Sequence, residues 1–365
     1  MINEKDYFYM RKAIELSQKG IGHTKSNPIV GCLIVKNDNI IGYGYHEKYG
    51  KAHAEINAIE NSTDSVANST MYVTLEPCFH YGKTPPCVKR IISEKIKRVV
   101  IGIEDPNPLV SGKSIDLMRK SGIQVETGLY TKEISKLNES FIYFIKNNRP
   151  FVTIKSAMSI DGKIACSNGD SKWISCEKSR EYTNKLRGVY NGIMVGINTV
   201  TKDNPSLTCR TEGFDNPIKI IIDTNLKIPL ESNVLKNKDI DKTYIYTCAD
   251  KTNEKFIHLN NLKNVEVVKV SSKNNQVNLK DVIKDLGSKN ISSIIVEGGG
   301  SINYSMIEEN LVQKIVFIIA PKIIGGKESL TPVEGTGFNT INETVKLNDV
   351  SIDFIENDIV VEGYL

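Results

Sequence analysis

The sequence predicts two consecutive α/β domains, with a boundary near residue 148. The chain has 365 residues, more than twice the ~150 residues of an average domain. Strand-like runs alternate with helical patterns in both halves, as in layered α/β folds. Between the halves, Asn147, Asn148 and Arg149 end a helical pattern, and Pro150 stops that helix and opens a new strand. We therefore expect domains at residues 1–148 and 149–365.

In the first half, an apolar face over residues 4–19, ended by Gly20 and Gly22, predicts a helix. Strand-like runs at 30–35 and 40–45 flank a polar turn and predict a hairpin. The elements expected next are a helix starting at His53, a strand at 71–75, a helix starting near Pro86, a strand at 98–103, a helix at 115–120, a strand at 123–126 and a helix at 132–148. The strand at 71–75 delivers Cys78 to its carboxyl end, where active sites of such folds are favoured.

The second half shows the same alternation with its own apolar segments. Its expected strands lie at 151–155, 192–195, 218–222, 243–247, 265–270, 293–296 and 315–319, and its helices around 177–186 and 279–286. These patterns indicate a second α/β domain with a core of its own.

Composition narrows the class of protein. Hydrophobic residues make up 40% and charged residues 25% of the chain, as in soluble globular proteins. The net charge of +4 is compatible with an anionic substrate but is weak for a nucleic-acid partner. The seven cysteines are odd in number and irregularly spaced, which argues for a reducing compartment. No secretory core and no run of about 18 apolar residues is present. We expect a cytoplasmic protein without nucleic-acid or membrane partners.

The most informative residues are His53, Glu55, Cys78 and Cys87, with a proline before each cysteine. Three zinc ligands leave one position open for water, as in catalytic sites. Two thiolates and one neutral imidazole balance the metal charge, so bound water can ionise near neutral pH. In zinc deaminases this pattern includes a glutamate that carries protons and does not bind the metal. We expect His53, Cys78 and Cys87 to bind Zn²⁺ and Glu55 to be catalytic.

Two alternatives are an ordinary buried trio and a structural zinc site completed by His46 or His80. Neither would need Glu55 or the two prolines. The prolines predict that each thiolate lies at a helix N-terminus, where the helix dipole favours the thiolate. Eight residues separate the cysteines, against two in nucleoside deaminases. That insert carries His80, Lys83 and Thr84, which suit a polar or phosphorylated ligand.

A glycine-rich turn follows the strand at 293–296. It reads Glu297, Gly298, Gly299, Gly300 and Ser301, with a helical pattern running on from Asn303. Glycines and a helix start let backbone N–H groups approach a phosphate, which suits a dinucleotide. The segment lacks the GxGxxG fingerprint, so a plain tight turn is the alternative.

Through these residues and the segments that surround them, the whole chain resembles the bifunctional deaminase and reductase family of riboflavin biosynthesis. The matching segments are 26–28, Val30-Gly31, 53–55, 74–78, 82–87, 105–108, 155–157, 159–162, 171–174, 203–208 and Arg210. Ser26, Phe79 and Ser114 depart from the residues usual in the family.

The resemblance implies a cytidine-deaminase-like α/β/α zinc domain followed by a domain similar to dihydrofolate reductase. The first would hydrolyse 2,5-diamino-6-(5-phosphoribosylamino)pyrimidin-4-one to the uracil and ammonia. The second would use NADPH to reduce the ribosyl group to ribityl. The partner is then a small phosphorylated pyrimidine, and the family leads us to expect a homo-oligomer, either a dimer or a tetramer.

The resemblance also implies the binding residues. Substrate contacts are expected at Asn27, His46, His80, Lys83, Lys155, Ser171, Arg187, Leu207, Arg210 and Glu297. Cofactor contacts are expected at Ala157, Trp173, Thr199, Asp203, Thr224 and Gly299 to Ser305, with Gly299, Gly300 and Ser301 foremost. Without the resemblance, Trp173 would be taken as core and Arg187 as a solvated helix face.

Two rival functions remain from the residues alone. One is a nucleobase or nucleic-acid deaminase with an attached nucleotide-binding domain, which the cysteine spacing and the lack of a basic, aromatic stretch disfavour. The other is a non-enzymatic zinc scaffold whose second half senses a nucleotide.

Overall fold

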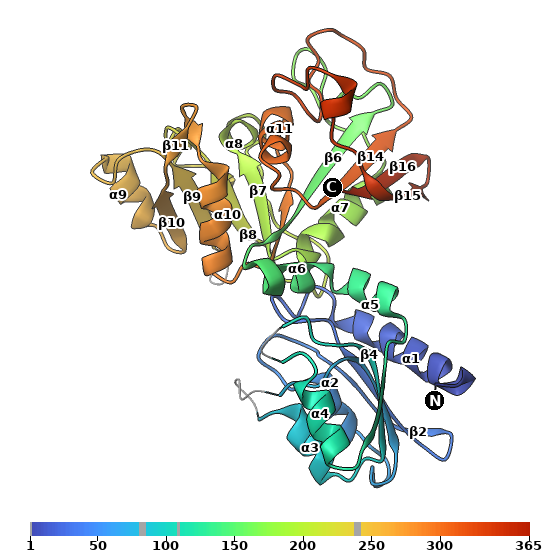
Figure 1. The fold of residues 1–365 in the computed structure, drawn as a ribbon. Coiled ribbons are helices and arrows are strands. Elements are labelled where there is room, and N and C mark those ends of the chain that lie inside the picture. The colour runs from blue at the N-terminus through green and yellow to red at the C-terminus, as the bar shows by residue number, and fades with distance from the viewer. Residues whose placement is uncertain (1, 80–84, 108–109, 237–241) are drawn as a thin grey trace. The chain divides into compact units, whose positions relative to one another are not determined.

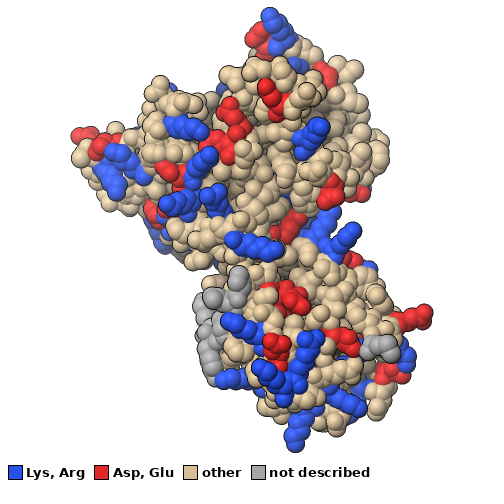
Figure 2. Space-filling view, viewed as in Figure 1, with Lys and Arg blue, Asp and Glu red and all other residues tan. Residues whose placement is uncertain are grey.

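The computed structural model describes residues 2–79, 85–107, 110–236 and 242–365. The chain folds as two compact units, residues 1–148 and 149–365, and each is an α/β layer structure (Figure 1). The α/β class predicted for both halves is confirmed. Acidic and basic side chains are interspersed over the face of the molecule shown in Figure 2.

The first unit is built on a five-stranded sheet in the order β2-β1-β3-β4-β5. Its strands are β1 (Gly31–Lys36), β2 (Asn39–Tyr45), β3 (Thr70–Leu75), β4 (Arg98–Ile103) and β5 (Gln124–Thr127). Strand β1 is antiparallel to β2 and β3, whereas β3, β4 and β5 are parallel.

Helices cover both faces of this sheet. They are α1 (Glu4–Ser17), α2 (Ala54–Glu60), α3 (Cys87–Ser93), α4 (Lys113–Lys120), α5 (Thr131–Leu137) and α6 (Glu139–Asn147), with a 3₁₀ turn at Gln18–Gly20. Helices α1 and α5 lie on one face, and α2, α3 and α4 on the other (Figure 1). The carboxyl ends of β3 and β4 therefore open towards the loops that precede α3 and α4.

The single helix expected over 132–148 is wrong, because the chain breaks at Asn138 between α5 and α6. The Asn138 side chain is turned to another segment. It accepts a hydrogen bond from the Ile29 N–H (2.7 Å) and donates one to the Ile29 carbonyl (3.1 Å). The apolar periodicity continues across the break, so the sequence pattern alone does not reveal it.

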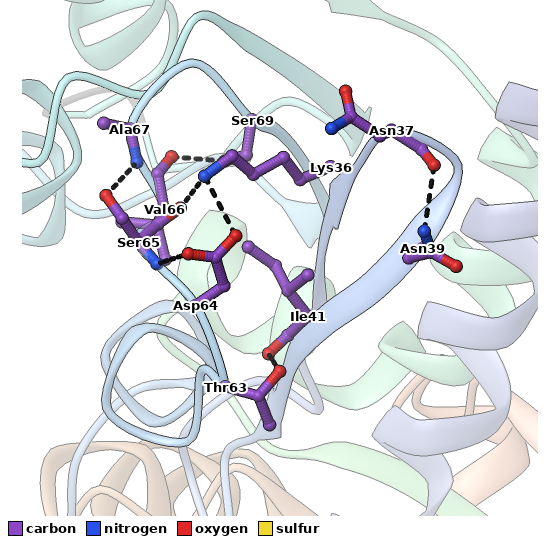
Figure 3. Close-up of polar contacts among 10 residues, drawn as sticks. All are labelled: Lys36, Asn37, Asn39, Ile41, Thr63, Asp64, Ser65, Val66, Ala67 and Ser69. Carbon is purple, nitrogen blue, oxygen red and sulfur yellow. Dashed lines mark hydrogen bonds and ion pairs between the residues drawn. The ribbon is translucent and has the colours of Figure 1, made fainter.

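The predicted β1–β2 hairpin is confirmed, and the segment that leads into β3 holds it in place (Figure 3). Asn37 and Asp38 both have positive φ, as a tight two-residue hairpin turn requires. The Lys36 ammonium donates to the Asp64 carboxylate (3.1 Å) and to the Ser65 carbonyl (2.7 Å). These contacts connect the hairpin to the chain between α2 and β3.

The second unit is built on a nine-stranded sheet in the order β10-β9-β8-β7-β13-β6-β14-β16-β15. Its strands are β6 (Phe151–Ser159), β7 (Gly192–Gly196), β8 (Ile218–Ile222), β9 (Thr243–Thr247), β10 (Val265–Lys269), β13 (Ser293–Val296), β14 (Lys314–Ala320), β15 (Asn348–Ile355) and β16 (Asp358–Tyr364). The first seven in sheet order are parallel, and β16 and β15 continue antiparallel. Strands β11 (Ser272–Lys273) and β12 (Gln276–Val277) form a separate small hairpin.

The helices of this unit pack on both faces of the sheet. Successive side chains of each strand point to opposite faces, so neighbouring strand residues contact different helices. Ile294 and Val296 belong to the same apolar cluster as residues of α10 (Leu279–Ser288) and α11 (Gly300–Glu308). Ile295, between them, belongs to the cluster that includes residues of α7 (Glu177–Val189), α8 (Ile197–Asp203) and α9 (Glu254–Asn260). Side chains alternate across a strand, so one short apolar run contributes to both layers.

Several elements of the second unit were missing from the sequence prediction. They are α8, α9, the hairpin β15–β16, the small β11–β12 hairpin, and the 3₁₀ turns at Asn233–Leu235 and Ile341–Glu343. Strand β15 lies at the sheet edge, and most of its residues are exposed. The β15 sequence does alternate, with Val350, Ile352 and Phe354 separated by Ser351 and Asp353, but these apolar residues are exposed rather than packed on the core.

Among the described residues, no helix is both long enough and apolar enough to cross a membrane.

A buried ion pair attaches α1 to the sheet of the first unit. Asp6 is fully buried and receives two hydrogen bonds from the Arg98 guanidinium (2.7 and 2.9 Å) and one from the Tyr72 hydroxyl (2.8 Å). Its carboxylate also accepts from the Asn3 N–H and closes a capping box at the start of α1. Burial acts to raise the pKa of Asp6, but the Arg98 and backbone hydrogen bonds lower it below its ordinary value.

We predict that Asp6→Ala destabilises the first unit by about 3–5 kcal/mol, because it leaves the guanidinium of Arg98 buried without a counter-ion. Urea unfolding, monitored by circular dichroism, measures the change in the free energy of unfolding. The stabilisation by Asp6 is present above the ordinary aspartate pKa and is lost as the pH falls through the lowered pKa of the folded protein. The difference in free energy of unfolding between parent and variant should therefore become smaller in acid.

Lys5→Ala is the matched control. The Lys5–Asp38 pair (2.7 Å) has side chains that are 65% and 66% exposed, and its loss should change stability by less than about 0.5 kcal/mol. Equal effects of the two substitutions would contradict the role given to Asp6.

Candidate active sites

In the first unit, one histidine nitrogen and two cysteine sulfurs converge. The ligand atoms of His53, Cys78 and Cys87 all lie within 4.8 Å of one another. The Nδ1 atom of His53 is 3.5 Å from the Cys78 Sγ and 3.3 Å from the Cys87 Sγ. His53 and Cys78 are half-buried and Cys87 is buried. The sequence motif therefore folds into one compact donor set.

Two glycines of β2 determine how closely the helix that carries His53 approaches the sheet. A Cβ at Gly44 would lie 2.5 Å from the Ala54 carbonyl oxygen, and one at Gly42 would lie 2.4 Å from the Ala58 carbonyl oxygen. Any larger residue at either position would push α2 away from β2. His53 is the N-cap residue of α2, so this close packing positions its ring.

Cys87 and Cys78 are placed by different means. Cys87 begins α3 directly after Pro86, as predicted. The prediction that Cys78 begins a helix of its own is wrong, because residues 76–79 are irregular. The Cys78 sulfur instead accepts the backbone N–H of Cys87 (3.2 Å), so the start of α3 faces both sulfurs. A hydrogen bond with Cys87 lowers the pKa of the Cys78 thiol to about 4.

Glu55 lies one residue inside α2 and is 3% exposed. Burial raises the pKa of its carboxyl group, and the neighbouring charge of His53 opposes that shift. A carboxyl group with a raised pKa can both accept and release a proton near neutral pH. Glu55 is thus placed beside the donor set and is suited to proton transfer.

The donor set fits zinc. A neutral imidazole and two thiolates are ligands that zinc favours, and a cluster of three leaves room for a fourth, non-protein ligand. His46 is not part of the cluster, although it was considered as a fourth ligand. Its Nδ1 is 3.1 Å from the Ala52 carbonyl, and its Nε2 is 3.1 Å from the Asn27 amide nitrogen. Both ring nitrogens are therefore occupied.

Asn27 and His46 instead form a polar group next to the zinc ligands. The rings of His46 and His53 meet edge to face, with centroids 5.5 Å apart. Burial lowers the pKa of His46, which favours the neutral ring. With Nδ1–H donated to Ala52, the Nε2 atom accepts from Asn27 and orients its amide. His80, Lys83 and Thr84 lie outside the described residues.

In the second unit, candidate residues gather where β6, β7 and β13 end. Strand β13 is inserted between β7 and β6, and all three are parallel. Their carboxyl ends therefore lie side by side, which is the place where open α/β sheets bind ligands. Glu297 directly follows β13, and its N–H bonds the Met194 carbonyl of β7 (3.0 Å).

Three charged residues meet there. Arg187 of α7 donates through Nε and Nη2 to the two oxygens of Glu297 (2.8 and 2.9 Å), and the Lys155 Nζ of β6 lies 3.9 Å from Glu297. The Arg187 side chain is 20% exposed, so the solvated-face alternative is wrong. Although burial raises the pKa of Glu297, the charges of Arg187 and Lys155 lower it below its ordinary value. Burial lowers the pKa of Lys155.

The other predicted substrate residues are less closely associated with this group. Ser171 is half-buried in the loop after β6, and Leu207 and Arg210 lie in the loop after α8. Leu207 is 3% exposed and has a positive φ of 52°. Within the described residues, no hydrogen bond joins any of the three to Lys155, Arg187 or Glu297.

The predicted cofactor residues occupy several elements. Ala157 follows Lys155 by two positions in β6 and so shares its face of the sheet. Thr199 and Asp203 lie in α8, and Thr224 follows β8, where its hydroxyl accepts the Val277 N–H (3.3 Å). Trp173 is 63% exposed, so the core alternative is wrong. The Arg180 guanidinium lies 4.7 Å from the centroid of its ring.

The glycine-rich turn serves packing as well as access. A Cβ at Gly298 would lie 2.1 Å from Ile302, and one at Gly300 would lie 2.4 Å from Glu334, whereas Gly299 faces open space. The Ser301 hydroxyl donates to the Glu334 carboxylate (2.9 Å). Glu334 thus lies beside the start of α11. No local sequence pattern indicated this contact with Ser301. Of this turn, Gly299 best matches the expected close approach to a ligand.

Comparison with known proteins finds a matching family model for each half of the chain. The model of the cytidine and deoxycytidylate deaminase zinc-binding region matches residues 3–103, and the model of the RibD C-terminal domain matches residues 150–361.

Relatives match over nearly the whole chain. The riboflavin biosynthesis protein RibD of Actinobacillus pleuropneumoniae is 42% identical over 98% of this chain and 94% of its own length, and that of Aquifex aeolicus is 40% identical over 99% of each. A crystal structure from Thermotoga maritima, described as a diaminohydroxyphosphoribosylaminopyrimidine deaminase and 5-amino-6-(5-phosphoribosylamino)uracil reductase, matches with a TM-score of 0.86 at 34% identity, over 98% of each chain. Acinetobacter baumannii RibD matches with a TM-score of 0.88 at 30% identity, over 99% of each. The chain therefore belongs to the RibD family of riboflavin biosynthesis proteins, with a zinc-binding deaminase domain followed by a reductase domain.

Proposed function

We propose that the chain deaminates 2,5-diamino-6-(5-phosphoribosylamino)pyrimidin-4-one in its first unit and reduces the resulting ribosylaminouracil to the ribityl compound in its second. The observation that carries the first step is the convergence of His53, Cys78 and Cys87 beside the buried Glu55. The second step rests on the RibD C-terminal domain match and on the buried charged group around Glu297. The second reaction acts on the product of the first, and both compounds are phosphorylated pyrimidines.

For the deamination, we assign the metal to His53 Nδ1 and to the two cysteine sulfurs. Zinc bound there supplies the Lewis acidity that activates water for attack on the ring carbon. Glu55 takes one proton from the attacking water and passes it to the ring nitrogen. It then takes the second proton from the newly added hydroxyl group and delivers it to the amine, so that the carbonyl forms as the C–N bond breaks and ammonia leaves. Asn27, held by neutral His46, orients the pyrimidine. His80 and Lys83 are assigned to the substrate from the family resemblance alone.

For the reduction, we assign NADPH to the carboxyl edge of the sheet, with Ala157, Trp173, Thr199, Asp203, Thr224, Gly299, Gly300 and Ser301 as its contacts. The cofactor supplies the hydride. Lys155, Arg187 and Glu297, together with Ser171, Leu207 and Arg210, hold the sugar phosphate. The two cations attract the phosphate ester, and Glu297 fixes their positions. The main contribution of the protein is to align hydride donor and acceptor.

The rival functions explain less. A nucleic-acid deaminase or a non-enzymatic scaffold would account for the zinc motif, but neither accounts for a RibD C-terminal domain over residues 150–361. We also propose that the protein acts in the cytoplasm. All seven cysteines lie in the described part of the chain and none of them is in a disulfide, as a reducing compartment permits.

We further propose that the chain forms a homo-oligomer, a dimer or tetramer, through the edge strand β15. Ile352 and Phe354 project from the same face of that strand and are 61% and 70% exposed. An exposed apolar edge strand is an open template for pairing with another copy.

The zinc assignment predicts that the purified parent carries about one zinc per chain and that Cys78→Ser carries almost none, because the site loses one of three protein ligands. Elemental analysis after dialysis measures this. Cys166→Ser, at an exposed cysteine, is the matched control and should keep the metal. Zinc retention by Cys78→Ser would refute the ligand set.

The two activities should be separable by substitutions in the two units. Glu55→Gln should lower ammonia release by at least ~100-fold, since it removes the proton carrier, while reduction of pre-deaminated substrate continues. Glu297→Gln should lower kcat/KM of that reduction by roughly 10- to 100-fold, since it weakens a charged hydrogen-bond pair, while ammonia release continues. Ammonia assays and NADPH absorbance follow the two steps.

Each variant is the control for the other. If either substitution abolished both activities in a folded protein, the assignment of one reaction to each unit would be wrong.

The oligomer proposal predicts a native mass of two or four times the chain mass of 40.7 kDa. A double change of Ile352→Lys and Phe354→Lys should convert the assembly to monomer, because charges on the paired edge would be buried. Analytical ultracentrifugation measures the mass, and Ile257→Lys on α9, at the other end of the sheet, should not alter it. A monomeric parent would end this proposal.

A further inference from the structure

Glu76, the residue before Pro77 and Cys78, has a buried carboxylate whose two oxygens both accept hydrogen bonds. Glu76 is 3% exposed. Its Oε2 accepts the backbone N–H groups of Asp105 (3.1 Å) and Gly112 (3.0 Å), and its Oε1 accepts that of Ser114 (3.1 Å). Each of the three donors lies about 30 or more residues further along the chain, in the loop after β4 or in the first turn of α4.

These contacts replace the N-terminal cap that α4 lacks. The N-cap residue of α4 is Gly112, which has a φ of 76° and no side chain to accept a hydrogen bond. The first N–H groups of a helix need partners, and a carboxylate there is also favoured by the helix dipole. Glu76, from a different segment, is that partner. It therefore connects the end of β3 to the start of α4.

A second contact holds the next residue. Ser114 is fully buried, and its hydroxyl donates to the Pro77 carbonyl oxygen (2.6 Å). Two side chains therefore connect this segment to α4. The Glu76 carboxylate accepts hydrogen bonds from backbone N–H groups at the start of α4, and the Ser114 hydroxyl of α4 donates one to the Pro77 backbone. Neither contact involves an atom of the metal donor set.

The residue held by this arrangement is Cys78. Its carbonyl accepts the Val88 N–H (3.3 Å) and its sulfur accepts the Cys87 N–H (3.2 Å), which fixes it on the side of α3. The Glu76 and Ser114 contacts fix the two preceding residues on the side of α4. Contacts to α3 and to α4 together therefore maintain the distance between the Cys78 sulfur and His53 Nδ1.

We propose that Glu76 and Ser114 are positioning residues that hold the Cys78 sulfur in place for the metal. This inference rests on the proposed zinc site and deepens it. Groups that support metal ligands without touching the metal typically contribute 10- to 100-fold to metal affinity. The pair acts by keeping the Cys78 segment from moving away, so its loss speeds metal release while leaving all three ligands in place.

The test compares zinc release from the full-length, zinc-loaded protein to a chromogenic chelator. Glu76→Gln, which puts an amide N–H₂ where carboxylate oxygen accepted, should raise the dissociation rate roughly 10-fold or more. Ser114→Ala, which removes one hydroxyl, should raise it by a smaller factor. With Co²⁺ in place of zinc, both variants should show altered visible bands. At saturating zinc, deaminase activity should recover and reductase activity should equal that of the parent.

Ser69→Ala is the matched control, because the buried Ser69 hydroxyl also donates to a backbone carbonyl, that of Val66, at 2.6 Å (Figure 3). It should release zinc at the parent rate. The inference is overturned if Ser114→Ala releases zinc at the parent rate, or if Ser69→Ala releases it as fast as Ser114→Ala. Ser114→Ala decides the question even if Glu76→Gln does not fold. A parent protein without zinc would instead refute the proposed function.

Discussion

The Cys78 sulfur lies where three pieces of the first unit meet, and the chemistry of that unit depends on their meeting within a few ångströms. His53 comes from the start of α2, Cys87 from the start of α3, and Cys78 from the end of β3. Each piece is held by contacts outside the donor set. Glycines of β2 let α2 approach the sheet, and the Cys87 N–H and the Glu76–Ser114 pair hold the Cys78 segment. Metal ligands placed in this way need little reorganisation to bind an ion.

Charge burial in the second unit follows a different principle. Lys155, Arg187 and Glu297 are all largely withdrawn from water, and two cations surround one anion. Burying an unpaired charge is costly, so each of these residues depends on the others. The group carries one surplus positive charge at the carboxyl edge of the sheet. That surplus is what an anionic substrate would meet.

Sequence reasoning succeeded where information is local. The short strand-like runs at 71–75, 98–103 and 293–296 predicted strands that the structure contains, and two such runs on either side of the polar residues 37–39 predicted the hairpin. The donor types and spacing of His53, Cys78 and Cys87 singled out three residues whose ligand atoms the structure brings together. It failed where a local pattern was overridden. The helical period across Asn138 did not reveal that its side chain is bonded to Ile29.

The sequence by itself determined the donor chemistry, the strand and helix types and the family, because residue identity, short-range period and motif spacing are properties of neighbouring positions. Only the tertiary structure decided that Glu76 caps α4, that Ser114 bonds Pro77, that Arg187 is paired with Glu297, and that Glu334 reaches Ser301. These partners are 33 to 110 positions apart. A hydrogen bond depends on distance in space, and contacts over such separations arise only when the sheet and its helices have packed.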